Sequence, residues 1–291
     1  MPFDSVDSVV SALTNGQRET IMGNRIVNTG ATSVAGRTHE AIASTGFGGV
    51  IALTGTPGAG AAFTSASGGL PQANPTVGGG MTKHLAAMKV WTNVATMVPG
   101  YAILTDLLYM YPSLVVTGTP TTLNNSVPTP TRFGTGVGVR ALCVAATALG
   151  AAQPVLSTLY TDETSDPGRV GAFAASANSL PVGAAFTGTN IAGQLGSANM
   201  RMDAGDAGIE TIDSYTISAG STTGTVSMLL HRPIAGVPLV AANVVSERNF
   251  LFDLPSLPKI EENACLCLLV VIGGALVANS IINYELETVW G

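Results

Sequence analysis

The clearest pattern of hydrophobic and polar positions lies in the last segment of the chain, 275–290. Large apolar residues there share one parity and polar residues share the other. The apolar positions are Ile282, Tyr284, Leu286 and Trp290, and the polar positions are Asn283, Glu285 and Glu287. Because successive side chains of a strand point to opposite faces, this alternation predicts a strand with one buried and one solvated face.

Further apolar runs, separated by glycine, proline and serine, read as strands in the same way. They are 83–95, 101–111, 137–149, 154–161, 209–218, 223–231 and 265–272. Asp106 interrupts the run 101–111, where a helical turn is the alternative. Seven to nine short strands of this kind predict a mainly β fold, an antiparallel β-sandwich of the jelly-roll type.

A short helix is predicted at the start of the chain. Val6, Val9, Val10 and Leu13 recur at helical spacing, Asp4 can cap the segment, and Asn15-Gly16 is a natural stop. A helix of about three turns is marginal by itself in water. We therefore expect it to dock on its own domain or on a neighbouring subunit.

The stretch 30–80 is rich in Gly, Ala, Ser, Thr and Pro and has few large side chains. Such a composition supplies little core and is typical of an extended arm. We expect this arm to be held against a large surface, of its own chain or of a partner. The predicted organisation is a helix and Gly/Ala/Thr-rich arm over 1–81, followed by a β-sandwich domain over 82–291.

The composition excludes several classes of function. Charged residues make up 10% of the 291 residues, with 12 basic and 18 acidic side chains and a net charge of −6. So few cations cannot neutralise many phosphates, which argues against nucleic-acid binding. The longest apolar run, 264–278, is shorter than the roughly 18 residues that a spanning helix needs. We also expect no secretory signal, because residues 1–10 lack a basic leader and an apolar run.

Motifs for chemistry are weak. Cys143, Cys265 and Cys267 form neither a disulfide framework nor a zinc motif, and we interpret them as small core residues. The glycine-rich run 134–139 departs from the dinucleotide fingerprint at its last position, and no Gly-x-Ser-x-Gly elbow occurs. The histidines His39, His84 and His231 are far apart, although a triad assembled only in space stays open. We expect no cofactor and no enzymatic activity.

Two acidic segments are candidate cation loops. One is 202–210, which carries Asp203 and Asp206, and the other is 162–168. Hard cations prefer oxygen ligands from such loops, but the spacing departs from the calcium-loop pattern. The alternative is that both segments are ordinary polar turns next to strands.

Aromatic residues near the ends of the chain are candidate anchors for a partner. The candidate contact residues are Phe3, Val6, Val9, Val10, Leu13, Tyr284, Leu286 and Trp290. Packing into the chain's own core is the alternative role for these side chains. A carbohydrate site would need clustered exposed aromatics, for which Trp91, Tyr109 and Tyr111 are the candidates.

The segments 203–218 and 262–271, together with the opening helix that ends in Asn15-Gly16-Gln17-Arg18, resemble a family of tailed-bacteriophage virion structural proteins. The resemblance implies a head protein, a cement or decoration subunit of the capsid shell, located in the virion and assembled in the host cytoplasm. Its implied partners are copies of itself and the major capsid protein, with no nucleic acid or membrane. The alternatives are a tail, collar or baseplate component, the main capsid protein, a carbohydrate-binding host-attachment sandwich, and a hydrolase or lyase.

Overall fold

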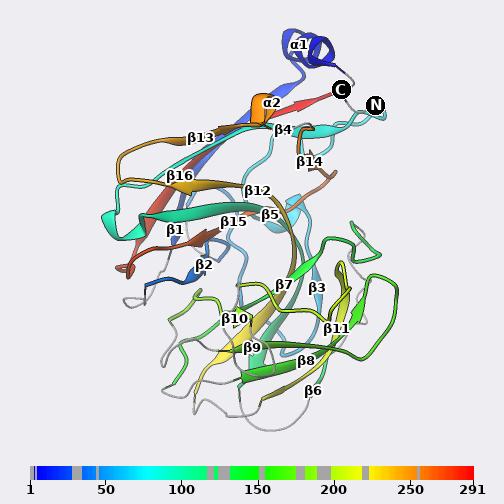
Figure 1. Ribbon diagram of the computed structural model, residues 1–291, viewed down its shortest axis with the longest axis vertical. Helices are drawn as coiled ribbons and strands as arrows, with labels where there is room; N and C mark the ends of the chain where they lie inside the picture. Colours follow the sequence, from blue (N-terminus) through cyan, green and yellow to red (C-terminus); the bar gives the residue numbers. More distant parts are fainter. Residues whose placement is uncertain are drawn as a thin grey trace.

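The computed structural model describes residues 3, 5–27, 35–43, 46–116, 121–123, 132–150, 155–174, 181–188, 198–217, 223–253 and 256–291. These residues form three antiparallel β-sheets with a short N-terminal helix, α1 (Val6–Thr14) (Figure 1). The predicted mainly β fold with a short N-terminal helix is therefore confirmed. No helix in this part of the chain is long and apolar enough to cross a membrane.

Each sheet combines strands that are distant in the sequence. The first sheet has the order β1 (Arg18–Val27), β16 (Ser280–Trp290), β4 (Lys83–Trp91) and β13 (Ser246–Asn249), and β14 (Lys259–Ile260) also pairs with β4. The second has the order β2 (Thr38–Glu40), β15 (Leu266–Val271), β5 (Gly100–Val115), β12 (Thr225–Leu239) and β7 (Arg140–Ala145), and β3 (Ala61–Ala62) pairs with β5. The third has the order β10 (Thr187–Gly188), β9 (Arg169–Ala174), β8 (Val155–Asp162), β11 (Ile209–Ile217) and β6 (Thr121–Thr122).

The strand pairs are nested along the chain. β1 pairs with β16, β2 with β15, β5 with β12, and β8 with β11, all antiparallel. A chain folded back on itself in this concentric way is a rolled-up hairpin, so the sandwich is jelly-roll-like, as predicted. Short connecting elements complete the described part: α2 (Phe250–Asp253) and the single turns η1 (Ser65–Ser67) and η2 (Ala95–Met97).

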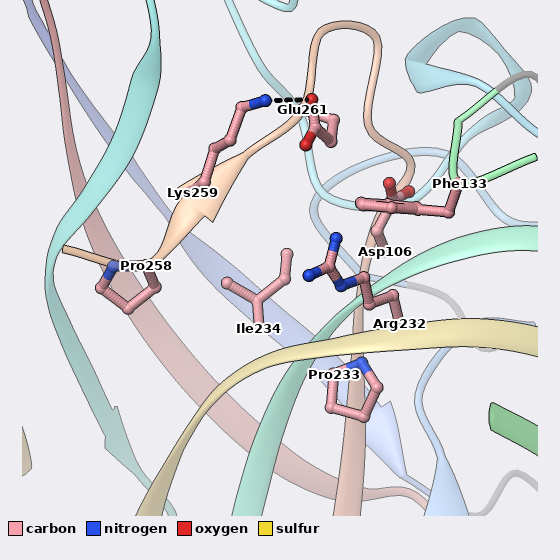
Figure 2. Close-up of a pocket in the computed structure, with 8 residues that line it drawn as sticks. All are labelled: Asp106, Phe133, Arg232, Pro233, Ile234, Pro258, Lys259 and Glu261. Atoms are coloured by element: carbon pink, nitrogen blue, oxygen red, sulfur yellow. Dashed lines mark ion pairs between the residues drawn. The ribbon is translucent and has the colours of Figure 1, made fainter. Parts of the chain in front are cut away.

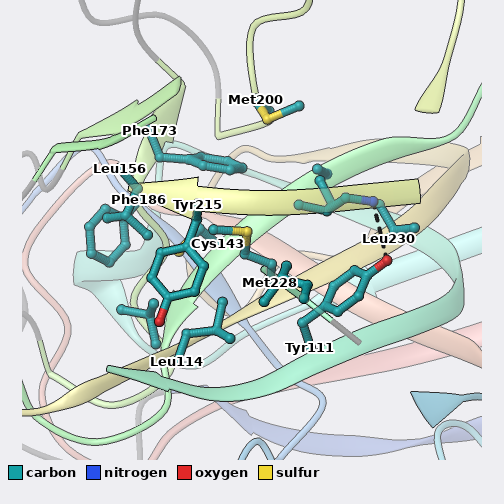
Figure 3. Packing of buried hydrophobic residues seen from close by; sticks show 14 of the residues in the cluster. Tyr111, Leu114, Cys143, Leu156, Phe173, Phe186, Met200, Tyr215, Met228 and Leu230 are labelled. Atoms are coloured by element: carbon teal, nitrogen blue, oxygen red, sulfur yellow. Dashed lines mark hydrogen bonds between the residues drawn. The ribbon is translucent and has the colours of Figure 1, made fainter. Parts of the chain in front are cut away.

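The second sheet lies in the middle and packs against both other sheets (Figure 1). Its contact with the first sheet buries side chains such as Leu85, Leu104 and Leu286. Its contact with the third sheet buries an aromatic-rich cluster that includes Tyr111 and Phe173 (Figure 3). β5 and β12 have 16 and 15 residues, long enough to contribute to both cores.

The glycine-rich stretch contributes more core than the sequence predicted. Ile42, Ile51, Leu53 and Phe63 are buried with Leu142, Val144 and Leu229 of the second sheet. These sheet residues alternate with those that face the third sheet, so the stretch covers the opposite face. The prediction of little core in 30–80 is thus wrong for its described residues, which are held by their own chain.

Backbone hydrogen bonds fix this stretch to the second sheet. The Phe63 amide donates to the Leu108 carbonyl at 2.9 Å, and the Leu70 amide donates to the Leu266 carbonyl at 2.7 Å. Gly60 shows why small residues are needed, because a Cβ there would lie 1.9 Å from the Tyr109 hydroxyl oxygen. Glycine at such positions lets the covering segment approach the sheet closely.

Most predicted strands are confirmed, but several strands were missed. The segment 101–111 lies within strand β5, so the helical alternative there is wrong. β1 and β9 were not predicted, and the described residues hold sixteen strands rather than seven to nine. In β16 the predicted alternation holds, since Ile282, Tyr284 and Leu286 are buried and the residues between them are half-buried.

Candidate functional site

α1 and α2 lie at the same end of the molecule (Figure 1). Three large apolar side chains of these two helices are exposed. Val6 and Val10 of α1 are 73% and 53% exposed, and Phe252 of α2 is 85% exposed. We call these three residues the helical end surface. Large apolar side chains that are exposed at one end of a molecule are candidates for an interaction site.

α1 is anchored to the first sheet through its opposite face. Ser5 caps the helix, and a capping box joins its side chain to the Ser8 amide. The predicted cap Asp4 lies outside the described residues, and the N-cap position belongs to Ser5. Val9 and Ala12 are buried against Ala86 and Val289, which belong to β4 and β16.

α2 packs next to the same small cluster. Leu251 of α2, and Leu257 beyond it, are partly buried against the residues that anchor α1. The two helices therefore rest on one support and present Val6, Val10 and Phe252 away from it.

The other predicted contact residues have different positions. Phe3 and Leu13 are half-buried beside the α1 anchor. Val9 and Trp290 are buried within the chain. Tyr284 and Leu286 are fully buried in the core between the first and second sheets, so they cannot meet a partner without opening the sandwich. For these two residues the core-packing alternative is correct, because both lie on the buried face of β16 that the alternation in the sequence predicted.

The aromatics considered for a carbohydrate site are not an exposed cluster. Tyr109 and Tyr111 are buried, and their rings meet edge to face with centroids 5.1 Å apart. The Tyr111 hydroxyl accepts a hydrogen bond from the Ile212 amide at 3.1 Å (Figure 3). These two side chains therefore fill the core instead of forming a binding platform.

The two acidic segments, predicted separately, meet around Arg169. Its Nε donates to Asp162 Oδ2 at 3.0 Å, its Nη2 pairs with Asp166 at 3.0 Å, and Asp206 lies within 4.0 Å. Tyr160 donates its hydroxyl proton to Asp206 at 2.5 Å. Within the described residues, no group of three or more His, Cys, Asp or Glu side chains is arranged to hold a metal ion. The positive charge of this cluster is supplied by the arginine.

Hydrogen bonds tie the turn after β8 together. The pKa of Asp162 is lowered to about 2, chiefly because it accepts the Asp166 backbone amide and the Thr164 hydroxyl. In the same region Glu163 accepts the Gly208 amide at 2.9 Å. These contacts fit the alternative of two polar turns next to strands, which antiparallel pairing of β8 with β11 brings side by side.

The three histidines lie on three different strands. His39 lies on β2, His84 on β4 and His231 on β12. Burial lowers the pKa of both His39 and His231 to about 4, so both rings are neutral at pH 7. Cys143, Cys265 and Cys267 are free thiols and are buried, which confirms their interpretation as small core residues.

A cavity of about 320 Å³ opens beside the middle of β5 and β12, next to β14 of the first sheet (Figure 2). It is lined by Asp106, Phe133, Arg232, Pro233, Ile234, Pro258, Lys259 and Glu261. We call this cavity the waist pocket. The only signal for it in the sequence is Asp106, a carboxylate inside an otherwise apolar run.

Asp106 is held by a bidentate ion pair. Arg132 Nε donates to Asp106 Oδ2 at 2.9 Å, and Arg132 Nη2 donates to Oδ1 at 2.8 Å. The Cys265 amide donates to the same Oδ1 at 2.8 Å. Burial raises the pKa of Asp106, and the Arg132 guanidinium opposes that rise. The pair lies at the edge of β5 between two strands that pair with it: β15, whose first residue Leu266 is opposite Asp106, and β3, which is opposite Tyr109 and Met110.

The comparisons with known proteins show only weak likeness. No family model matches the chain, and no curated protein matches it. The VP1 protein of Trichodysplasia spinulosa-associated polyomavirus, solved with sialylated glycooligomers, has a TM-score of 0.27 and 10% identity over 100% of this chain and 97% of its own. Apo VP1 of chimpanzee polyomavirus has a TM-score of 0.28 and 9% identity over 99% and 97%.

A structure of the Gt strain of infectious bursal disease virus is weaker still, with a TM-score of 0.18 and 10% identity over 94% of this chain and 80% of its own. Together these matches amount to a weak structural resemblance to viral capsid proteins. With TM-scores this low, we base no inference about function on them.

Proposed function

We propose that this chain is a virion structural protein, which self-associates and binds the capsid shell as a cement or decoration subunit. The observation that supports this role is the helical end surface, where Val6, Val10 and Phe252 are exposed on a firmly anchored support. In this proposal the chain has no enzymatic role, and its partners are copies of itself and the major capsid protein.

The energetics of the helical end surface favour docking. Full burial of a Val or Phe side chain contributes about 1.5–3 kcal/mol of favourable free energy, so burial of these three side chains would stabilise the centre of an interface. A low content of charged residues, 10% of the chain, also reduces the desolvation cost of close subunit contacts. Assembly stabilises the folded subunit by mass action, because neighbours bind only the folded form.

The test uses two double variants. Val6→Asp/Val10→Asp places two carboxylates on the helical end surface, and Val244→Asp/Val277→Asp makes the same change at two half-exposed valines elsewhere. Point substitutions are preferable to removing residues 1–30, because that region contains β1, which pairs with β16 from Arg18 to Val27. Each variant is compared with the wild type by sedimentation velocity and by co-sedimentation with preformed capsid shells.

We expect Val6→Asp/Val10→Asp to lose self-association and shell binding, while its thermal unfolding stays close to that of the wild type. The Val244→Asp/Val277→Asp control should bind as the wild type does. Unchanged shell binding by Val6→Asp/Val10→Asp would contradict the proposed surface. A wild-type chain that ignores shells but binds glycans on an array would replace the proposal with the carbohydrate-binding alternative.

A further inference from the structure

Arg232 lies in the waist pocket and forms no ion pair with any residue that the structure describes. It is on β12, directly across from Asp106 on β5 in the antiparallel register. Opposite charges at such cross-strand positions ordinarily pair. Here they do not, because Arg132 and the Cys265 amide occupy the oxygens of Asp106.

The other carboxylate of the pocket is also occupied. Glu261 pairs with Lys259 at 2.8 Å (Figure 2). Within the described part of the chain, no acidic side chain lies within ion-pair distance of Arg232. Each of the two carboxylates is paired with its own cation, Asp106 with Arg132 from outside the lining and Glu261 with Lys259, so Arg232 is the lining cation left without a carboxylate.

The surroundings of Arg232 hold its guanidinium in place. The guanidinium carbon lies 4.0 Å from the centroid of the Phe133 ring, a cation–π contact. Gly138 lies alongside, with φ +76°, and a Cβ there would come within 3.3 Å of Arg232 Nε. Figure 2 shows the guanidinium pointing among the lining residues between Ile234 and Phe133. A cation fixed in this way loses little side-chain entropy when it binds a ligand.

The remaining wall of the waist pocket is apolar. Pro233, Ile234 and Pro258 form it, beside the Phe133 ring. A volume of about 320 Å³ is at the lower end of the range for small-molecule sites, which excludes large ligands. A planar fork of donors above an apolar wall matches a carboxylate joined to a small apolar body.

We propose that the waist pocket binds a small organic acid with one carboxylate, which Arg232 holds by a bidentate ion pair while the apolar body of the acid contacts Ile234 and the two prolines. A single negative charge is preferred over a multiply charged anion, because Asp106 and Glu261 also line the pocket. This site does not depend on the proposed role in the virion.

The test measures binding of benzoate to the full chain by saturation-transfer difference NMR and titration calorimetry. Benzamide, which has the same shape without the charge, and inorganic phosphate are the ligand controls. Arg232→Gln removes the anchor. The matched control is Arg248→Gln, since Arg248 also lies over an aromatic ring, Phe250, at 5.4 Å but outside the pocket.

We expect saturable benzoate binding, with benzamide and phosphate much weaker. Arg232→Gln should reduce benzoate affinity about tenfold or more, the scale of a lost charged hydrogen bond, and Arg248→Gln should not change it. Because Arg232→Gln can affect folding, Ile234→Phe provides a second variant, which narrows the cavity and should also weaken binding.

Three results would overturn the assignment. They are equal binding of benzoate and benzamide, benzoate affinity that survives both pocket variants, and no benzoate binding by the folded wild type. Tighter binding of an acidic peptide than of benzoate would also overturn it, because the carboxylate would then come from a polypeptide.

Discussion

Replacing Ile51 by Ala tests whether the glycine-rich stretch belongs to the folded domain or is an arm ordered only on assembly. Ile51 is 3% exposed and lies in the cluster that covers one face of the second sheet. Its neighbour Val50 is 49% exposed and points away from this cluster. These two adjacent residues therefore provide a buried position to test and an exposed position as its control.

The expected loss of stability follows from the buried carbon atoms. Ile51→Ala removes three carbons from the core, at about 0.8 kcal/mol each, which gives about 2.4 kcal/mol before any cavity is counted. The cavity left behind raises the cost, and substitutions of this kind lower the free energy of unfolding by about 2–5 kcal/mol. Val50→Ala removes two half-exposed carbons and should change it by less than about 0.5 kcal/mol.

The assay is urea unfolding of the isolated full-length chain, followed by fluorescence and circular dichroism. A loss of 2 kcal/mol or more for Ile51→Ala, with little change for Val50→Ala, supports a stretch that is folded in the free subunit. A loss below about 0.5 kcal/mol for Ile51→Ala would refute the reasoning, because that side chain would not be packed before assembly.

Two further predictions concern buried polar groups. Asp106→Ala leaves the Arg132 guanidinium buried without its carboxylate and should lower the free energy of unfolding in urea by about 3–5 kcal/mol. Glu287→Ala, which breaks the more exposed pair with Lys89, should lower it by less than about 1 kcal/mol. Equal losses for the two variants would contradict the buried pair. The pKa of His231 is lowered to about 4 by burial, so the unfolded state binds more protons than the folded state between pH 6.5 and 4. The free energy of unfolding should therefore fall as the pH drops through this window, and His231→Gln should flatten that fall; an imidazole NMR signal of His231 that titrates near pH 6.5 in the folded chain would disagree.

Alternation in the sequence was enough to predict strands whose two faces have different surroundings. In β16 the inward parity is apolar and the outward parity is polar, so both the strand and its buried face could be inferred. β1 was missed because its sequence, RETIMGNRIV, mixes charged and apolar residues on both parities. Its position depends on pairing with β16, a partner more than 250 residues away, and no local pattern records such a pairing.

The covering role of 30–80 could not be predicted because composition describes average behaviour. Few large side chains are present, but Ile42, Ile51, Leu53 and Phe63 all point to the same sheet. The many glycines indicated a stretch without core packing. In the structure they assist that packing, since Gly60 lets the backbone of the stretch lie close to Tyr109. A segment can be poor in core residues and still be an essential part of the core.

The candidate sites were only partly visible in the sequence. Val6 and Val10 were predicted as contact residues, and they are on the exposed face of α1, whereas Phe252 had no signal because α2 was not predicted. The waist pocket joins residues from β5, β12 and β14. Arg232 forms no ion pair with Asp106 because Arg132 pairs with that carboxylate instead. The sequence does not show which of the two arginines pairs with Asp106.

The central claim is that this chain is a structural subunit which docks through its helical end surface. Electron cryo-microscopy of an assembled particle that contains the chain tests this most directly. We predict that Val6, Val10 and Phe252 are buried against a neighbouring subunit of the shell. A particle in which these three side chains face solvent would contradict the account.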